Sequence, residues 1–325
     1  MHHAEGQQGD ILTAGVSPAS PTGGKVGALV RALRPKQWAK NFLVFLPFAF
    51  SIHERWSPAE PGVASILLGK AMLAFLLFCL LSSAVYLVND AVDAPRDRLH
   101  PRKRLRPIAS GALPLGMAWG AALGLGLMGV AGSFALREWF GAVALIYLAS
   151  TSAYTFILKR LVIIDVMALS AGYILRAVAG AVAVQAPISP WLYVVTGLGA
   201  LLIGIGKRRN ELALASAHNP ATAHAQRPVL GEYTIPLLDQ LLAVVAPSTL
   251  IAYTLYTFTA PNLPSNHAMM LTIPFVLFGL FRYLYLVHAR NLGEAPEDVL
   301  LTDKPLLAAV GLWVATAMAV LLLLR

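Results

Sequence analysis

Nine long apolar stretches, separated by polar segments, constrain the fold of this chain more than any other feature of its sequence. Most approach the roughly 20 residues that a helix needs to cross the hydrocarbon core of a membrane. Strands of a membrane barrel would alternate apolar with polar residues and end after about ten residues, and these stretches do neither. The expected helices are residues 41–53 (extended backwards through Trp38), 62–88, 113–136, 139–157, 162–183, 191–206, 235–258, 268–287 and 305–324. The sequence therefore predicts an all-α integral membrane protein with nine transmembrane helices.

The composition supports a membrane protein. Of the 325 residues, 57% are hydrophobic and 13% are charged, whereas a soluble domain has roughly 25% charged residues. This apolar content excludes a disordered chain, and the single cysteine, Cys79, excludes a disulfide scaffold. Because Cys79 lies in an apolar run, we expect it to be a buried small hydrophobic residue.

Lysine and arginine orient the helices, because cytoplasmic loops of membrane proteins carry an excess of both. With a cytoplasmic amino terminus and an odd number of helices, the carboxyl terminus lies outside. All basic residues then fall on the cytoplasmic side except Arg55, Lys70, Arg137, Arg176 and Arg325. The net charge of +9 is mainly this orientation signal, and nucleic-acid binding is excluded because no soluble basic domain is present. We expect a multi-pass protein of the plasma (inner) membrane.

The domain organisation is simple. Residues 1–24 lack the apolar segment of a signal peptide and are expected to form a disordered cytoplasmic tail. Residues 25–325 are expected to form a single catalytic domain. The polar loops 89–112, 207–234 and 289–304 all fall on the cytoplasmic side, so the chemistry is expected to face the cytoplasm.

An acidic cluster is the most informative local feature. Asp90, Asp93 and Asp97 are spaced by three and four residues, which places them on one face of a helix that continues past the membrane, and Asn89 adjoins them. Three like charges on one stripe repel each other, so stability does not explain them. Oxygen ligands of this kind suit Mg²⁺, and nearby cations suit a polyphosphate. The alternative is a solvated loop whose charges enforce topology, although topology does not require carboxylates.

The residues Asn89-Asp90-x-x-Asp93-x-x-x-Asp97 resemble the NDxxDxxxD signature of the UbiA-type polyprenyl transferases. That resemblance implies a nine-helix bundle with a cytoplasmic-side active site, in which Mg²⁺ binds a diphosphate. Members of this family usually carry a second DxxxD motif after the sixth helix. Here Lys207 stands at the first aspartate position and Glu211 at the second. A cation in place of a metal ligand indicates a different anion, a monophosphate held by direct ion pairing.

Further segments resemble one branch of the family, the decaprenyl-phosphate phosphoribosyltransferases. They are RPKQWAKN at 34–41, HPRK at 100–103, RPIASG at 106–111, residues 154–160, RPVLGEY at 227–233 and LTDKP at 301–305. The resemblance implies transfer of 5-phosphoribosyl from 5-phosphoribosyl-1-diphosphate to a polyprenyl (decaprenyl) phosphate lipid, with release of diphosphate. Its product would supply cell-wall arabinan.

Three anionic groups must be bound in that reaction. Asp90, Asp93 and Asp97 are the expected Mg²⁺ ligands, with Asn89 as a direct or orienting ligand. Lys36 is expected to act with these aspartates in catalysis. The cations expected to bind the substrate phosphates are Lys36, Lys40, Arg102, Lys103, Arg106, Lys159, Arg160, Lys207 and Arg208.

Five further candidates have two readings each. Asp165 and Arg176 are charges within an apolar stretch, where a charge is a functional candidate by default, although each is also compatible with structural pairing. They lie about 16 Å apart along a helix, so we do not expect them to pair with each other. Tyr154 either hydrogen-bonds a substrate or belongs to an interfacial belt, and His100 either donates to phosphate or is a solvated loop residue. Glu211 either binds a metal or orients Lys207.

Two rival functions share parts of this pattern. A UbiA-type transferase that moves a prenyl group from a prenyl diphosphate to an aromatic ring would use the same first motif but predicts a second aspartate cluster. A transporter of phosphate-bearing solutes predicts ionisable residues deep in several helices. The sequence leaves open the prenyl chain length and whether the protein forms a homo-oligomer.

Overall fold

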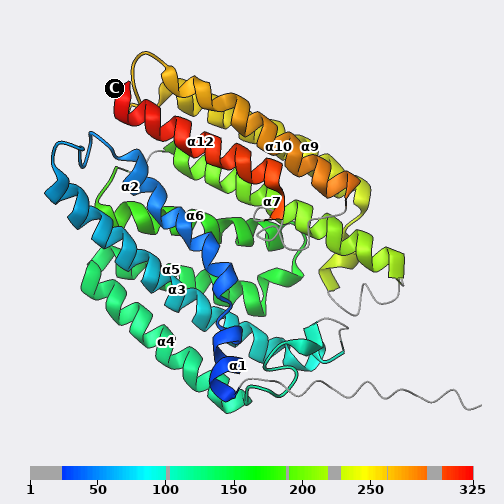
Figure 1. The fold of residues 1–325 in the computed structure, drawn as a ribbon. Helices are drawn as coiled ribbons and strands as arrows, with labels where there is room; N and C mark the ends of the chain where they lie inside the picture. Colours follow the sequence, from blue (N-terminus) through cyan, green and yellow to red (C-terminus); the bar gives the residue numbers. More distant parts are fainter. Residues whose placement is uncertain are drawn as a thin grey trace, which may run out of the picture.

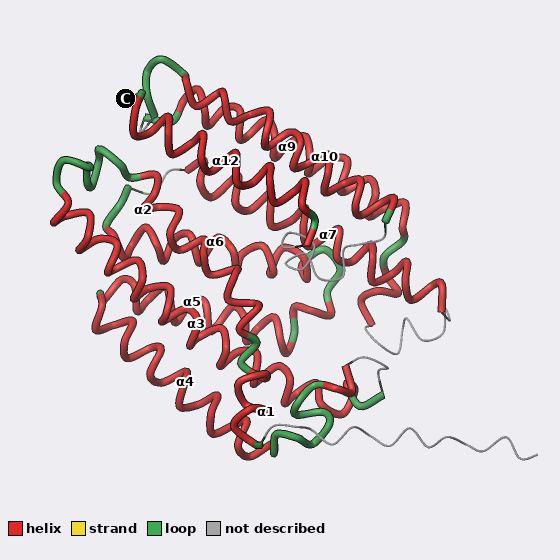
Figure 2. Tube along the Cα trace, in the orientation of Figure 1, coloured by secondary structure: helices red, strands yellow, loops and turns green. Residues whose placement is uncertain are grey.

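The fold is built entirely of helices in the part of the chain that the structure, a computed structural model, describes: residues 24–99, 103–187, 190–218, 228–261, 263–290 and 302–324. Figure 1 shows long helices that run side by side, and Figure 2 shows helices joined by loops without a strand in these residues. One isolated bridge joins Ile52 and Trp56. The expected all-α fold is confirmed, while the expected tail lies outside the described residues apart from Gly24.

The described chain contains ten α-helices and five 3-10 helices. The α-helices are α1 (Lys25–Ala32), α2 (Leu46–Phe50), α3 (Pro61–Asp97), α4 (Leu115–Leu136), α5 (Glu138–Phe156), α6 (Ile164–Val184), α7 (Pro190–His218), α9 (Ile235–Thr259), α10 (Ile273–Ala289) and α12 (Lys304–Leu323). The 3-10 helices are η1 (Pro35–Phe45), η2 (Lys103–Leu105), η3 (Leu158–Arg160), η4 (Pro228–Glu232) and η5 (Ala268–Thr272). As the spacing of its aspartates predicts, α3 continues without interruption to Asp97.

Seven helical segments of the described chain are long and apolar enough to cross a membrane. They match the expected stretches that begin at residues 62, 113, 139, 162, 235, 268 and 305. The expected segment 191–206 is helical, within α7. The protein is therefore a multi-pass membrane protein, but the count of nine spanning helices is not confirmed.

The first expected helix, residues 41–53, is wrong as a continuous membrane-spanning helix. The chain forms η1 and then the five-residue α2, and His53 lies in the turn that follows. Pro47 stands at the start of α2, where it lacks the N–H that an uninterrupted helix needs. The segment also packs closely on α6, since a Cβ at Gly180 would lie 2.1 Å from the carbonyl oxygen of Val44. This crossing requires glycine at position 180.

Helix α6 lies at the centre of the bundle and contacts α5, α7, α3, α2 and η1. Helices α3, α4 and α5 pack on one side of α6. On the other side α7 packs against α9, and α10 and α12 pack against each other beyond them (Figure 1). Helix α3 ends at the same end of the bundle where α6 begins. We call this the motif end, and the other the opposite end.

Candidate functional site

The aspartates of α3 are held by cations from distant segments. Asp90 is 2% exposed, and its Oδ1 accepts hydrogen bonds from Arg34 Nη2 at 2.6 Å and from Arg106 Nη1 at 3.1 Å. The same nitrogen of Arg106 donates to Asp97 Oδ2 at 2.7 Å. Asp93 accepts from Lys159 Nζ, on η3, at 2.8 Å. Each carboxylate of the motif therefore already contacts a cation that has the chemistry to bind a phosphate.

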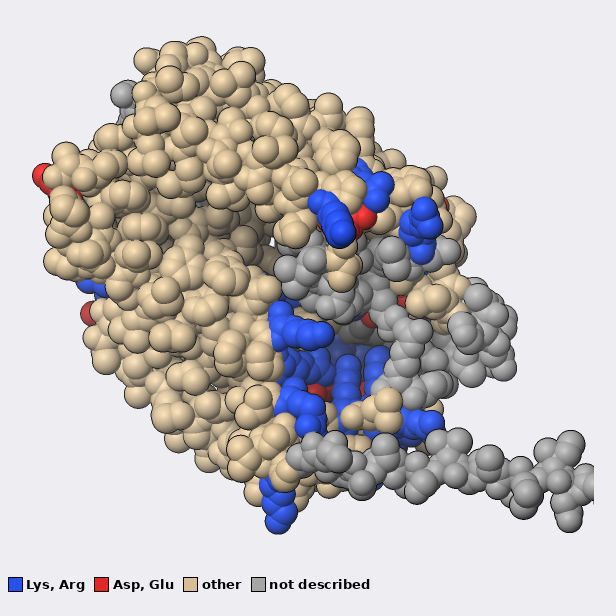
Figure 3. All heavy atoms as spheres, in the orientation of Figure 1, with Lys and Arg blue, Asp and Glu red and all other residues tan. Residues whose placement is uncertain are grey.

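These cations are accessible. The side chains of Arg34 and Arg106 are 25% and 27% exposed. In Figure 3, lysine and arginine side chains gather around one hollow of the molecular face, and acidic atoms are visible inside it. The rest of the face seen is largely uncharged. The electrostatic character of this hollow suits a polyanion.

A divalent metal fits the donors on α3, although their arrangement here is not that of a closed metal site. Among the described residues, no three acidic, histidine or cysteine side chains come close enough to share an ion. However, Oδ1 of Asn89 is buried without a hydrogen-bond partner. An orphaned buried oxygen costs free energy, and Asn89 lies on α3 next to Asp90 and one turn before Asp93. This donor set suits Mg²⁺, which is usually bound through one or two carboxylates.

A cavity of about 160 Å³ opens beside the motif between η1, α3, α5, α6 and α7. Five residues expected from the sequence to bind substrate line it: Lys40, Asn89, Tyr154, Arg176 and Lys207. They come from five different helical segments. The tertiary structure thus gathers three cations and two polar side chains around one space.

Arg176 lies at this cavity and is 5% exposed. Its Nε donates to Asn41 Oδ1 at 2.7 Å, and its terminal nitrogens donate to Gly172 O at 2.7 Å and to the Tyr147 hydroxyl at 2.9 Å. Its guanidinium carbon also lies 4.9 Å from the centre of the Tyr147 ring. Asn41 and Tyr147 were not among the candidates from the sequence, because nothing in the local pattern of an apolar helix marks them.

Asp165 is buried and paired, as the structural one of its two readings expects. It is fully buried, and its Oδ2 accepts from Arg208 Nε at 2.5 Å, while its Oδ1 accepts from the Tyr233 hydroxyl at 2.6 Å. Arg208, also fully buried, donates to Glu211 at 2.7 Å and to Tyr154 at 3.2 Å. Asp165 therefore pairs with Arg208 rather than with Arg176, and Glu211 contacts Arg208.

Tyr233 anchors this buried group at the start of α6. Its hydroxyl accepts from the N–H of Ile163 at 2.7 Å, and Ile163 has φ of 67°, a left-handed conformation that a β-branched residue rarely adopts. Burial raises the pKa of the Tyr233 phenol, and its hydrogen bond to Asp165 raises it further. The phenol therefore stays protonated and remains a donor to Asp165.

Three other expected residues, Lys36, Lys103 and Arg160, lie on the short 3-10 helices near the motif end. Lys36 and Arg160 are exposed on η1 and η3, and Lys103 lies on η2 before Arg106. His100 and Arg102 lie outside the described residues. Arg34 was missed as a site residue. Its place in the basic segment before Pro35 was the available signal, but its contact with Asp90 joins residues 56 positions apart.

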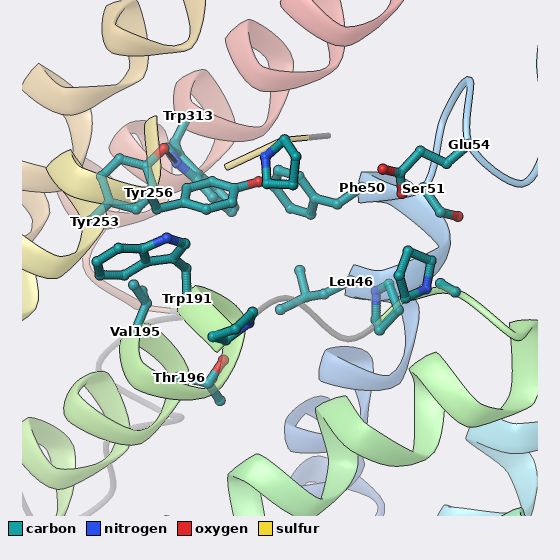
Figure 4. A pocket seen from close by; sticks show the side chains of 15 residues that line it. Leu46, Phe50, Ser51, Glu54, Trp191, Val195, Thr196, Tyr253, Tyr256 and Trp313 are labelled. Atoms are coloured by element: carbon teal, nitrogen blue, oxygen red, sulfur yellow. Dashed lines mark hydrogen bonds between the residues drawn. The ribbon is translucent and has the colours of Figure 1, made fainter. Parts of the chain in front are cut away.

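A second cavity lies at the opposite end of the bundle. It has a volume of about 400 Å³ and is lined by α2, the end of α6, the start of α7, α9 and α12. Figure 4 shows Phe50, Trp191 and Tyr256 around its interior, with Glu54 and Ser51 at one side. Its walls are predominantly aromatic and aliphatic, so it suits an apolar ligand.

Comparisons with known proteins agree on one family. A match described as the UbiA prenyltransferase family covers residues 44–302. The decaprenyl-phosphate phosphoribosyltransferase of Mycobacterium tuberculosis is 36% identical over 298 residues, covering 91% of this chain and 95% of that protein. The protein with the same name in Corynebacterium glutamicum is 34% identical over 294 residues, covering 88% and 84%.

Solved structures share the fold. A UbiA homolog from Archaeoglobus fulgidus bound to DMAPP and Mg²⁺ is similar with a TM-score of 0.68 and 19% identity, covering 90% of this chain and 99% of that one. A digeranylgeranylglyceryl phosphate synthase is similar with a TM-score of 0.62 and 13% identity, covering 92% and 99%. At these identities the likeness concerns the fold alone.

Proposed function

The chain belongs to the UbiA prenyltransferase family and is a transferase, and from that premise we propose that it transfers 5-phosphoribosyl from 5-phosphoribosyl-1-diphosphate to a polyprenyl phosphate. The acceptor would be a long-chain lipid such as decaprenyl phosphate, and diphosphate would be released. The product, a lipid-linked pentose phosphate, would serve as a precursor of cell-wall arabinan. The relatives' names supply the acceptor and the transferred phosphoribosyl group, and the resemblance of the sequence motifs implies phosphoribosyl diphosphate as the donor.

The observation that carries this proposal is the cavity with three cations beside the acidic motif. Lys40, Arg176 and Lys207 border one space, next to carboxylates already in contact with Arg34, Arg106 and Lys159. A prenyl diphosphate and an aromatic acceptor would bring one diphosphate. Two substrates that together carry a diphosphate, a ribose 5-phosphate and a lipid phosphate account for more of these cations.

Mg²⁺ would be held by Asn89 and one or two of Asp90, Asp93 and Asp97, where it would neutralise charge on the diphosphate. With the carboxylates holding a metal, Arg106 and Lys159 would be free to contact the phosphate oxygens of the donor. This exchange of partners keeps the hollow close to charge balance before and after the donor binds. The attraction between these cations and the phosphate oxygens is strongest in a site shielded from water.

The reaction itself needs positioning more than acid–base chemistry. An oxygen of the lipid phosphate forms a bond to C1 of the ribose while the bond from C1 to the diphosphate oxygen breaks. The nucleophile is already ionised at neutral pH, so no general base is required. Attack from the side opposite the leaving group would turn the α-linked donor into a β-linked product. The chain's contribution is to hold two anions on either side of one carbon atom.

The lipid's hydrocarbon chain requires an apolar space within the bundle. The aromatic cavity at the opposite end provides one, and α7 connects it with the cation-lined cavity. Trp191, Val195 and Thr196 face the former, whereas Ala200, Gly204 and Lys207 face the latter (Figure 4). The motif end, where the diphosphate of the donor would bind, would face the cytoplasm.

The test is an incubation of the purified protein with Mg²⁺, labelled phosphoribosyl diphosphate and a polyprenyl phosphate. We expect label in the lipid phase, loss of that signal on chelation with EDTA, and a β anomer by NMR. A parallel reaction supplies labelled prenyl diphosphate with an aromatic acceptor. Label entering lipid product only in the parallel reaction would overturn the proposal in favour of aromatic prenylation, and covalent product in neither would overturn both.

A further inference from the structure

The inference concerns Arg176, whose positive charge is unusual for its position. It is 5% exposed, and all three of its hydrogen-bond acceptors are neutral: an amide oxygen, a backbone carbonyl and a phenol. Within the described residues no carboxylate pairs with it. Arg208, the other buried arginine near the cavity, contacts both Asp165 and Glu211. A buried charge without a counter-ion is costly, which indicates that an anion completes the site.

The surroundings of Arg176 are already arranged. The Asn41 side chain that accepts from Nε donates its own amide nitrogen to Ser82 Oγ at 3.2 Å and to Cys79 Sγ at 3.3 Å. These donations fix which way the amide points. Tyr147 is 2% exposed and holds the other side of the guanidinium. The arginine therefore needs little reorganisation to bind a ligand, which favours affinity.

The guanidinium keeps two donors for that ligand. An arginine has five N–H groups, and the three acceptors of Arg176 use the one on Nε and one on each terminal nitrogen. One N–H remains on Nη1 and one on Nη2. Each of these N–H groups can donate to a phosphate oxygen, and the side chain borders the cavity.

The position of Arg176 along the bundle separates it from the acidic motif. On α5, Tyr147 precedes Tyr154 by two helical turns, which is about 10 Å, and Tyr154 contacts Arg208 at the motif end. On α6, Arg176 follows Asp165 by eleven residues, or about 16 Å. Arg176 thus lies at the inner end of the cavity, whereas Asn89 and Lys207 lie toward the motif end.

We propose that Arg176, oriented by Asn41 and Tyr147, binds the phosphate monoester of the lipid acceptor. This rests on the proposed function and assigns one of its two anion sites. The donor carries charge at both ends and is drawn to the motif end, where the cations are accessible. The acceptor carries its phosphate on an apolar chain, so it alone of the two substrates is suited to the inner end of the cavity. The ribose would then lie between the two sites, as displacement at C1 requires.

The test measures binding without turnover. Binding of a polyprenyl phosphate and of the matched polyprenol, which has the same chain and no phosphate, is measured on the purified protein in detergent with no donor present. For the unaltered protein we expect a clear preference for the phosphate. In Arg176→Gln we expect that preference to fall about 100-fold, since two charge-assisted hydrogen bonds are lost. Binding of the alcohol should stay the same.

A second measurement assigns the ligand. Binding of phosphoribosyl diphosphate with Mg²⁺, measured without lipid, should be unchanged in Arg176→Gln. Arg282→Gln is the matched control, because Arg282 lies on α10, away from the cavity, and pairs with Asp303 at the start of α12. This variant should alter neither affinity. Arg176→Lys keeps the positive charge but loses the guanidinium donors. Its affinity for the lipid phosphate should therefore lie between that of the unaltered protein and that of Arg176→Gln.

Two outcomes would overturn the inference. One is an unchanged preference for phosphate over alcohol in Arg176→Gln, and the other is weakened donor binding with intact lipid binding. If Arg176→Gln does not fold, Arg176→Lys and Tyr147→Phe decide the question by the same preference. Failure of the proposed function is distinguished because it shows as an absence of transfer by the unaltered protein, whereas this test contains no donor.

Discussion

Two groups of carboxylates and arginines at the motif end look alike in sequence and differ in structure. In the acidic motif, Asp90 and Asp97 are buried, but their partners Arg34 and Arg106 are about a quarter exposed. In the group around Asp165, both the carboxylate and Arg208 are 0% exposed, and Tyr233 and Glu211 contact the pair as well.

The difference in exposure predicts a different role for each group. Cations that reach solvent can leave their carboxylates and contact an incoming phosphate at small cost. A pair with no exposure cannot exchange partners without leaving a bare charge in the interior. Asp165 and Arg208 therefore join α6 to α7, and the motif on α3 is available for ligands.

Breaking the buried pair should destabilise the protein most. Arg208→Met leaves Asp165 as an uncompensated buried carboxylate, which typically costs about 3–5 kcal/mol. The measurement is thermal unfolding in detergent. The double variant Arg208→Met with Asp165→Leu removes both charges and should recover most of the loss. If the double variant is as unstable as Arg208→Met alone, the unpaired carboxylate of Asp165 is not the cause of the destabilisation.

Changing the motif should affect turnover and not folding. Asp93→Asn removes one carboxylate charge from a side chain that is partly exposed and paired with Lys159. We expect turnover to fall by about 100-fold, equivalent to about 2.7 kcal/mol in the barrier, with an unchanged unfolding temperature. Initial rates of phosphoribosyl transfer and thermal unfolding of the same preparation are the measurements. Full activity in this variant would remove Asp93 from the site.

Tyr233→Phe should have an intermediate effect on stability. It removes the donor to Asp165 and the acceptor for Ile163, and a hydrogen bond to a charged group contributes about 1.5–3 kcal/mol. The pKa of Tyr233 is raised from its usual 10.0, so the folded state retains the proton more tightly than the unfolded chain. Its contribution is complete below about pH 10 and declines as the pH rises further.

Unfolding temperatures of the unaltered protein and of Tyr233→Phe should therefore converge above about pH 10. A constant difference between the two proteins across this range would contradict the assignment of Tyr233 as a protonated donor. Tyr285→Phe is a suitable control, since Tyr285 lies on α10, where its ring contacts Arg282.

The smallest effect is expected at Asp303, where an accessible pair meets a helix cap. Asp303 accepts from the N–H of Leu306 at the start of α12 and from Arg282. The hydrogen bond from Arg282 lowers the pKa of Asp303 below its usual 3.8, so its stabilising contribution is present above about pH 4 and is lost as the pH falls. Asp303→Asn keeps a capping oxygen and loses the charge.

The unfolding temperature of Asp303→Asn should be slightly lower at neutral pH and equal to that of the unaltered protein in acid. Because the pair is partly solvated, we expect a smaller change than for Tyr233→Phe. An equal or larger change would mean that exposed pairs at this end contribute as much as buried ones, and would weaken the comparison.

Local features of the sequence determined the helical fold and the acidic motif. Apolar stretches of sufficient length define spanning helices wherever they occur, because the requirement to satisfy backbone groups within lipid is local. The spacing of Asp90, Asp93 and Asp97 along α3 is equally local. The segment from Pro35 to Phe50 escaped this reasoning, because its prolines and its close approach to Gly180 outweighed its apolar composition.

The contacts of each charged residue follow from the packing of the helices. Asp165 meets Arg208 across 43 positions, Arg34 meets Asp90 across 56, and Arg176 meets Asn41 across 135. The sequence named most of these charged residues as candidates, since a charge in an apolar chain needs a reason. It could not distinguish a fully buried ion pair from a buried arginine whose acceptors are all neutral. That depends on how much water and which partners the packed helices leave around each group, and packing joins residues that no local pattern connects.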